Sequence, residues 1–388
     1  MVRVAILGQG MVATHLVVGL ERIKQGELEP YGVPLANYDV ACRIEDIEVV
    51  ASYDVDVKKV GKTVYDIAKE SLSKNGIPIP ETLKDIVVKK GIHLGSLKNL
   101  PFKAEGLDDK MSVADAINQL IDDWKSLNVE VVLDVITTEH GEPFNDAAKL
   151  EVAISNDQRD KLTAGAAYAY ALAKYAKENG KAAFINATPA PLANDLAFVQ
   201  HYSSNGALLL GDDGASGATP LTADLLEHLA ERNRRVLSVV QFNIGGNTDF
   251  LALAIPERNV MKEVTKSCIV KDILGYDVPS FIKPTGYLEP LGDKKFVSMH
   301  IEYLTFNGLR DEMFINVRLN DSPALAGKLV DVIRLAKMAL DKDCRGTLYE
   351  VNAFFMKKPG PPGSKAVAKI LAFQNLLKWL KSNGLLKQ

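Results

Sequence analysis

A glycine-rich turn near the start of the chain has the residue types that bind a pyrophosphate. Residues 8–13 are Gly-Gln-Gly-Met-Val-Ala; they follow the apolar segment 2–7 and begin a run of apolar residues at helical spacing over 11–23. In a strand–turn–helix context this spacing lets the backbone approach a dinucleotide at a helix N-terminus. The alternative is a tight turn that needs glycine only for its conformation. We predict a dinucleotide site that includes Gly8, Gln9, Gly10, Met11 and Val12.

An acidic residue ends the second predicted strand. Asp54 directly follows segment 47–53, where a carboxylate accepts hydrogen bonds from the adenosine ribose hydroxyls and repels a 2′-phosphate. This position favours NAD over NADP. The separation from Gly8 is longer than the usual roughly 20 residues, so we expect residues 25–46 to loop out as an insertion. Asp56 is a competing candidate, and a solvated turn carboxylate is the alternative for both.

Three polar segments each lie just beyond a predicted strand. They are Asn-Ala-Thr-Pro at 186–189, Gly-Asp-Asp-Gly-Ala-Ser-Gly-Ala-Thr at 211–219 and Asn-Ile-Gly-Gly-Asn-Thr-Asp at 243–249. Active sites of α/β proteins are built at strand ends. The middle segment resembles an anion-binding nest, because its Gly, Ser and Thr residues supply donors where a helix begins. An ordinary capped turn is the alternative for each segment.

Buried strands and amphipathic helices alternate over the first part of the chain. Strands are expected over 2–7, 47–53, 129–136, 182–186 and 236–242, and helices over 11–23, 113–127, 158–179 and 219–233. Such alternation is typical of right-handed βαβ crossovers and a parallel sheet. Residues 57–109 are assigned to loop and short helices. The fold class is therefore α/β, with a Rossmann-like doubly wound sheet.

The pattern changes beyond about residue 245. Half-exposed alternation over 296–304 and 311–319 flanks Gly308 and predicts an antiparallel sheet in a second, α+β unit. Long helices follow over 323–341 and 365–382, separated by a strand-like segment at 348–355. The predicted domains are residues 1–245, a dinucleotide-binding domain; 246–345, a catalytic and oligomerisation domain; and 346–388, which return to the first domain.

Composition agrees with a globular protein of two structural units. The chain has 388 residues, 47% of them hydrophobic, with Lys+Arg 46 against Asp+Glu 49 and a net charge of -3. No basic excess indicates nucleic acid, and charges interrupt every apolar stretch before the roughly 18 residues of a membrane span. The first strand begins at residue 2, which leaves no room for a signal peptide, and we expect a cytoplasmic protein.

Cysteine and histidine spacing argues against a metal site built on these residues. Cys42, Cys268 and Cys344 lie far apart, so neither a disulfide framework nor a thiolate zinc site is expected. The six histidines lack ligand spacing, and no structural metal is predicted. A divalent or monovalent cation held by oxygen ligands near Asp213, Ser216 and Asp249 is left open.

Several motifs, taken in order, resemble the inositol-1-phosphate synthase family over nearly the whole chain. They are Asn-x-Thr-Pro at 186–189, Gly-Asp-Asp-x-x-Ser-Gly-x-Thr at 211–219, Gly-Gly-Asn-x-Asp at 245–249, Lys-Glu-Val-Thr-Lys at 262–266 and Gly-Asp-Lys-Lys at 292–295. Residues 54–61, Asp-Val-Asp-Val-Lys-Lys-Val-Gly, are similar to the shorter prokaryotic members. An ordered set of motifs is far more specific than the glycine turn alone.

The resemblance implies an NAD-dependent enzyme, a homotetramer, that converts glucose 6-phosphate to 1D-myo-inositol 3-phosphate. Hydride leaves C5, the C6 enolate attacks the C1 aldehyde, and the ketone is reduced again without net redox change. The implied catalytic residues are Lys262, Lys266, Lys295, Lys357 and Asp321. The implied cofactor contacts are Thr188, Asp213, Ser216 and Asp293, and the implied substrate contacts are Asn243, Asn247 and Asp249.

The lysines suit the charges of this reaction. Two oxygens become negative and the phosphate is a dianion, and ammonium groups stabilise both. Lys262 and Lys266 are four residues apart, so on a helix they share a face. The resemblance places Lys262 near the C5 oxygen, as a proton shuttle or an oxyanion stabiliser, and Lys266, Lys295 and Lys357 around the C1 oxygen and phosphate; it does not fix the division of roles among them. A solvated surface charge is the alternative for each lysine, and a helix N-cap for Asp321.

One departure from the family pattern concerns the anion-nest segment. Family members usually carry a lysine before its Ser-Gly, and this chain has Ala215 there. Two other functions are compatible with the fold: an NAD-dependent dehydrogenase of the homoserine dehydrogenase type, and a catalytically silent NAD-binding sensor. The lysine pattern favours the synthase over both.

Overall fold

The computed structural model describes residues 1–387, except for the side chains of residues 264–268. Within these residues a parallel sheet has six strands in the order β3-β2-β1-β4-β5-β6. The strands are β1 (Val2–Leu7), β2 (Ile47–Asp54), β3 (Val88–Lys90), β4 (Val131–Asp134), β5 (Ala183–Asn186) and β6 (Leu208–Leu210). This is the Rossmann order, in which a ligand crevice forms outside the carboxyl ends where the order reverses, between β1 and β4.

Helices cover both faces of this sheet, which explains why its strands are almost continuously apolar. Val4 and Ile6 point to one face and Ala5 and Leu7 to the other, and all four are fully buried in two separate cores. On the first face lie α1 (Met11–Lys24), α2 (Val64–Leu72), α10 (Asp321–Asp341), α11 (Tyr349–Phe355) and α12 (Lys369–Ser382). On the second lie α3 (Val113–Ser126), α4 (Ala147–Ser155), α5 (Ala164–Asn179) and α6 (Leu196–Ser204).

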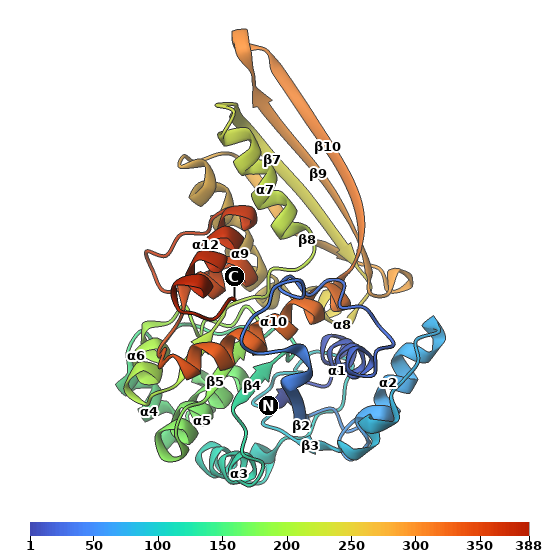
Figure 1. Cartoon of the computed structure of the whole chain (residues 1–388), viewed down its shortest axis with the longest axis vertical. Coiled ribbons are helices and arrows are strands. Elements are labelled where there is room, and N and C mark those ends of the chain that lie inside the picture. Colours follow the sequence, from blue (N-terminus) through green and yellow to red (C-terminus); the bar gives the residue numbers. More distant parts are fainter. Residues whose placement is uncertain (388) are drawn as a thin grey trace.

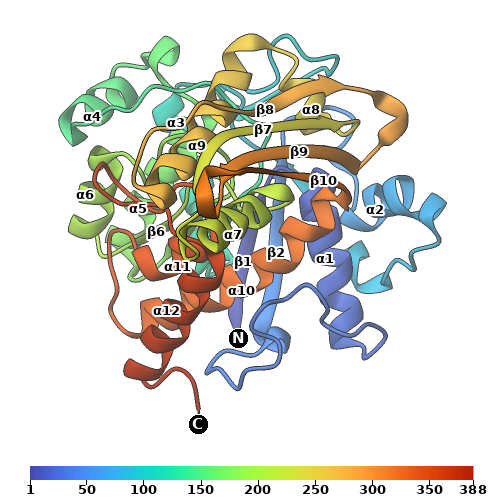
Figure 2. The same ribbon diagram turned by 90° about the horizontal axis from the view of Figure 1, so that it is seen from above.

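A second, mixed sheet rises from this body (Figure 1). Its four strands in the described chain have the order β10-β9-β7-β8, where only the β7–β8 pair is parallel. They are β7 (Arg235–Gly245), β8 (Ser280–Tyr287), β9 (Lys294–Leu304) and β10 (Arg310–Asn320). Helices α7 (Ala218–Ala230) and α9 (Pro256–Leu274) pack on one side of it (Figure 2), and the short α8 (Thr248–Ala252) follows β7.

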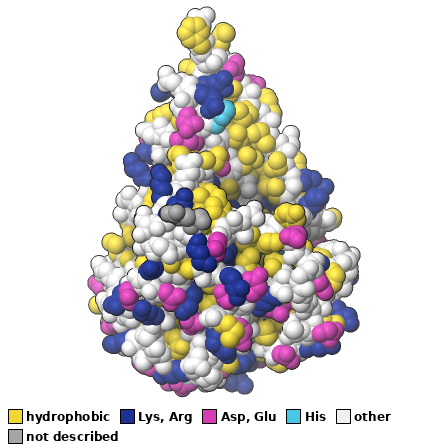
Figure 3. All heavy atoms as spheres, viewed as in Figure 1, with side chains coloured by type: hydrophobic (Ala, Val, Ile, Leu, Met, Phe, Trp, Pro, Cys, Tyr) yellow, Lys and Arg dark blue, Asp and Glu magenta, His cyan; other side chains and the backbone are white. Residues whose placement is uncertain are grey.

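The other side of the second sheet is exposed. Phe242, Phe281 and Phe314, from three different strands, are 44%, 39% and 69% exposed. Figure 3 shows hydrophobic side chains gathered along one flank of the projection. An apolar surface of this kind usually marks an interaction site rather than solvent-facing polypeptide.

The predicted α/β architecture is confirmed, but several individual elements are corrected, and the short strand β6 was not predicted. The strand expected at 236–242 is β7, which pairs with β8 and β9 in the second sheet and not with the parallel one. The strand-like segment 348–355 is helix α11. A short apolar run does not distinguish strand from helix, and here Val351 and Phe355, one turn apart, both enter the core.

Residues 57–109 contain α2 and the edge strand β3 as well as loop, so the assignment to loop and short helices missed one strand. The C-terminal segment lies against the first unit, because Leu376 and Leu380 of α12 join its core and Lys387 N–H donates to Asp39 O. No helix in the described part of the chain is long and apolar enough to cross a membrane.

Candidate active site

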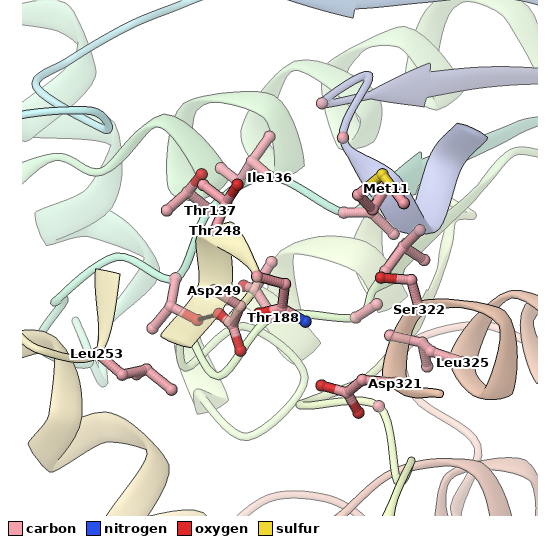
Figure 4. A pocket seen from close by; sticks show the side chains of 18 of the residues that line it. Met11, Ile136, Thr137, Thr188, Thr248, Asp249, Leu253, Asp321, Ser322 and Leu325 are labelled. Carbon is pink, nitrogen blue, oxygen red and sulfur yellow. Dashed lines mark hydrogen bonds between the residues drawn. The ribbon is translucent and has the colours of Figure 1, made fainter. Parts of the chain in front are cut away.

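One cavity lies where the carboxyl ends of the parallel strands meet the second sheet. The first unit supplies the glycine turn, Asp54 and the loop after β4, and the second supplies β7, α8, α9 and β9. Figure 4 shows Met11 and Ile136 on one side of this space and Asp249, Asp321 and Ser322 approaching it from other segments. The predicted crevice and the predicted polar segments are therefore in one place.

The glycine turn is shaped by close backbone contact. Gly8 has φ +89°, and a Cβ there would lie 2.9 Å from the Ile136 backbone Cα. Gly10 precedes α1, and within the described chain no side chain caps that helix. The first N–H groups of α1 are therefore left for a ligand, as in phosphate-binding helix N-termini. Gly8, Gly10, Met11 and Val12 line the cavity.

Asp54 joins the end of β2 to the glycine turn. Its Oδ1 accepts hydrogen bonds from the N–H groups of Val55 (2.8 Å) and Asp56 (2.9 Å). Its Oδ2 accepts from Gln9 N–H (2.9 Å) and Lys59 Nζ (3.0 Å). Both Asp54 and Lys59 line the cavity, so this part of its wall carries an ion pair rather than an isolated carboxylate.

Two lysines from distant segments meet at one buried carboxylate. Asp213 Oδ1 accepts from Lys357 Nζ at 2.8 Å and from Lys262 Nζ at 3.1 Å, and Lys262 also lies 3.6 Å from Asp249 Oδ2. Burial and the neighbouring charge of Lys262 outweigh the attraction of Asp213 and lower the pKa of Lys357 to about 8. Burial acts in the same direction on Lys262, but Asp213 and Asp249 outweigh it and raise its pKa.

A third lysine lies at the start of helix α7. Lys295, on β9, forms an ion pair with Asp321 and is 8% exposed. A Cβ on Gly217, which has φ +62°, would lie 2.3 Å from Lys295 Nζ, so only glycine lets the ammonium pass this close. Burial disfavours the charged form of Asp321, but Lys295 outweighs it and lowers the pKa of that carboxyl. Lys295 and the N-terminus of α7 line the same cavity, an arrangement of the kind that binds anions.

Comparison with known proteins decides the family. The model of the family described as myo-inositol-1-phosphate synthase matches residues 217–322. A solved myo-inositol-1-phosphate synthase-related protein from Thermotoga maritima is 52% identical, with all of each chain covered and a TM-score of 0.94. The chain belongs to the myo-inositol-1-phosphate synthase family.

More distant members of this synthase family extend the comparison. Inositol-3-phosphate synthase of Corynebacterium glutamicum is 29% identical over 92% of this chain and 93% of its own. Inositol-3-phosphate synthase of Caenorhabditis elegans is 16% identical, covers 100% of this chain and 86% of its own, and has a TM-score of 0.80. The second likeness shows that the fold is shared.

The structure gathers most of the family-type residues named from the sequence. Within the described part of the chain, Thr188, Asp213, Ser216, Asn243, Asn247, Asp249, Lys262, Lys295, Asp321 and Lys357 line the cavity. Lys266 falls among the side chains outside the described residues. Gln9 is not among the lining residues: its side chain accepts from Ser52 Oγ and donates to Thr14 Oγ1.

Asp293 is a second residue placed behind the cavity wall. Its carboxylate accepts from Ser322 N–H (2.9 Å), from Ser322 Oγ and from Asn247 Nδ2 (3.0 Å), and so holds the start of α10 against the loop after β7. Ala215 is fully buried, and its carbonyl accepts a hydrogen bond from Lys328 Nζ of α10. An ammonium group from α10 therefore lies beside the position where family members carry a lysine.

Several site residues escaped the sequence reasoning. Lys59, Thr138 and Ser322 line the cavity, and Arg258 lies behind it. Lys59 had a detectable signal, because it belongs to the Asp-Val-Asp-Val-Lys-Lys motif. Within the described residues no group of three His, Cys, Asp or Glu side chains is arranged to hold a metal ion. A cation near Asp213, Ser216 and Asp249 stays a prediction.

Replacing Gly8 with Ala is expected to lower the free energy of unfolding by at least about 2 kcal/mol. The left-handed backbone alone costs an L-residue roughly 1–2 kcal/mol, and the added Cβ overlaps the Ile136 backbone. Urea denaturation followed by circular dichroism measures the loss. Gly19→Ala is the matched control, because a Cβ there meets nothing within 4 Å. Equal stability of the two variants would contradict the steric account.

Proposed function

We propose that the protein is an inositol-1-phosphate synthase that converts glucose 6-phosphate to 1D-myo-inositol 3-phosphate with bound NAD, without net redox change. Family membership supports the reaction class. The observation that carries the proposal is that one cavity joins a dinucleotide-type glycine turn to three buried or nearly buried lysines, Lys262, Lys295 and Lys357. A simple dehydrogenase has no need of that many ammonium groups around its substrate.

The first unit fits a dinucleotide. The N-terminus of α1 provides donors for a pyrophosphate, and Gly10, where a Cβ would meet nothing within 4 Å, leaves room beside it. Asp54 and Lys59, at the end of β2, would hold the adenosine ribose. When bound, NAD accepts a hydride from C5 of the sugar and later returns it. We propose NAD rather than NADP, because the buried carboxylate of Asp54 disfavours a 2′-phosphate.

We assign the role of base to Lys357 and that of charge stabiliser to Lys262. Among the cavity lysines, Lys357 has a pKa lowered to about 8, so its amine is available near neutral pH to take the proton of the C5 hydroxyl. The raised pKa of Lys262 keeps it charged, as a group that stabilises developing negative oxygen must be. Asp213 orients both ammonium groups through its Oδ1.

The phosphate of the substrate would bind at the start of α7. Ser216 and Ala218, on either side of Gly217, line the cavity beside Lys295, so backbone N–H groups, a hydroxyl and an ammonium converge. Placing the phosphate there directs the sugar ring toward Lys262 and Lys357. The open chain can then bend so that C6 reaches C1, since both ends face ammonium groups within one enclosed space.

The experiment that tests the proposal is incubation of the purified protein with glucose 6-phosphate and catalytic NAD. Inositol phosphate observed by NMR, without net NADH, is the expected result. Stoichiometric NADH would show a dehydrogenase instead, and dinucleotide binding without any product would indicate a sensor. The second and third outcomes both contradict a synthase.

A homotetrameric assembly in the cytoplasm is part of the proposal. The exposed side of the second sheet, with Phe242, Phe281 and Phe314, offers a surface for another copy of the chain. Light scattering of the purified protein gives the oligomeric state. Within the described residues Cys42 and Cys344 are free thiols, which supports a reducing compartment.

A further inference from the structure

Arg258 ties together three segments that the proposed reaction uses. It lies in the first turn of α9 and is 7% exposed. Its guanidinium donates to three backbone carbonyls: Thr138 at 2.7 Å, Ser96 at 2.9 Å and Lys98 at 3.0 Å. The first acceptor belongs to the loop after β4 and the other two to the loop after β3. The planar guanidinium holds its donors in one fixed geometry, whereas the three donors of a lysine ammonium diverge from a single nitrogen on a flexible stem.

Both loops held by Arg258 are walls of the dinucleotide end of the cavity. Ser96 and Leu97 line it from one loop, and Thr137 and Thr138 from the other. These loops follow β3 and β4, so they lie on either side of the strands that carry the glycine turn and Asp54. A ligand that orders the two loops therefore also fixes the carbonyl groups that accept hydrogen bonds from Arg258.

The same helix carries Lys262 on the substrate side. Residues 258 and 262 are one turn apart and share a helix face. A second connection joins the loop after β4 to Lys262. Thr138 Oγ1 donates to Asp249 Oδ1 at 2.8 Å, and Asp249 Oδ2 lies 3.6 Å from Lys262 Nζ. The position of Lys262 therefore depends on the loop that contacts the dinucleotide, through the backbone of Thr138 and through its side chain.

We propose that Arg258 is a positioning residue that couples dinucleotide binding to the placement of Lys262, so that dinucleotide and sugar phosphate bind with positive cooperativity. This inference rests on the proposed function. A dinucleotide that orders the two loops also fixes the position of α9, because Arg258 of this helix binds both loops. A sugar phosphate that contacts Lys262 fixes the position of the same helix. The ligand that binds second then loses less binding free energy to ordering the protein. Each ligand raises the affinity for the other by the same factor.

The test measures the coupling between two ligands that do not react together. NADH cannot accept a hydride, so NADH and glucose 6-phosphate form a stable ternary complex whose affinities are accessible by NADH fluorescence. We expect saturating glucose 6-phosphate to lower the Kd of NADH by about tenfold in the wild type, within the usual range of coupling. The coupling ratio is the Kd of NADH without glucose 6-phosphate divided by the Kd with it. We expect this ratio to fall below about twofold in Arg258→Met and to be intermediate in Arg258→Lys.

The controls separate positioning from folding. Arg232→Met removes an exposed arginine at the end of α7 and should leave the coupling ratio unchanged. Thermal melts identify variants that fail to fold. If Arg258→Met does not fold, Arg258→Lys provides the test, because it keeps the positive charge but lacks the planar guanidinium. Wild-type coupling in a folded Arg258 variant, or NADH binding that is independent of glucose 6-phosphate in the wild type, would overturn the inference. Failure of the wild type to bind NADH would count against the proposed function instead.

Discussion

Lys262→Met is expected to reduce kcat for inositol phosphate formation by about 10³-fold while leaving the NADH affinity of the free enzyme within about twofold. Removing one preorganised donor to a developing oxyanion typically costs 10²–10³ in kcat, and the loss of a buried ammonium belongs at the upper end. Lys262 belongs to α9, whereas the glycine turn and Asp54 belong to the first unit. Steady-state kinetics and NADH fluorescence titration measure the two quantities.

The fold should survive this substitution, because both acids near Lys262 keep another partner. Asp213 still accepts from Lys357 at 2.8 Å, and Asp249 still accepts from Thr138 at 2.8 Å. No buried carboxylate is left unpaired, which is the usual reason for severe destabilisation. Lys271→Met, an exposed lysine of the same helix paired with Asp277, is the control and should retain full activity. Wild-type turnover in Lys262→Met would refute the assignment.

Lys357→Met is expected to lower kcat/KM by roughly 10²–10⁴-fold, the range for loss of a general base, and to change the pH profile. Burial lowers the pKa of Lys357 to about 8. Below that pH the group is protonated and cannot accept the hydroxyl proton; above it the amine is neutral. The wild-type kcat/KM should therefore rise as the pH increases through about 8. This rising limb of the pH profile should be absent in the variant.

Asp213→Asn provides an independent check on the same pKa. The carboxylate of Asp213 favours the charged form of Lys357, so its loss should move the rising limb to lower pH. Lys358→Met is the control for Lys357, because the hydrogen bonds recorded for residue 358 use its backbone and survive the change. An unshifted limb in Asp213→Asn would show that another group is the base.

Local pattern was sufficient for the glycine turn and for strands β1, β2, β4 and β5 of the first sheet, but not for the short strands β3 and β6. Segment 2–7 is mostly apolar and glycines stand at positions 8 and 10, so strand, turn and helix follow from short-range geometry. The ordered motifs were sufficient for the family, because they occur along the chain in the family's order. Most of the site residues chosen from them line one cavity.

Tertiary structure alone decided how these residues work together. Apolar residues over 236–242 predict a strand but not the sheet that it joins, and β7 belongs to the second sheet, which has one exposed face. Gln9 and Asp293 belong to matching motifs, yet their side chains bond to neighbouring segments behind the cavity.

The contrast between Lys262 and Lys357 likewise has no counterpart in the sequence. Both are lysines in family motifs, and both contact Asp213. Their pKa values move in opposite directions because Lys262 has Asp249 nearby in addition to Asp213, whereas at Lys357 the cost of burial outweighs the attraction of Asp213. Residue type and spacing therefore determine which groups enter the site, and the summed field of segments distant in sequence determines which of them carries a proton.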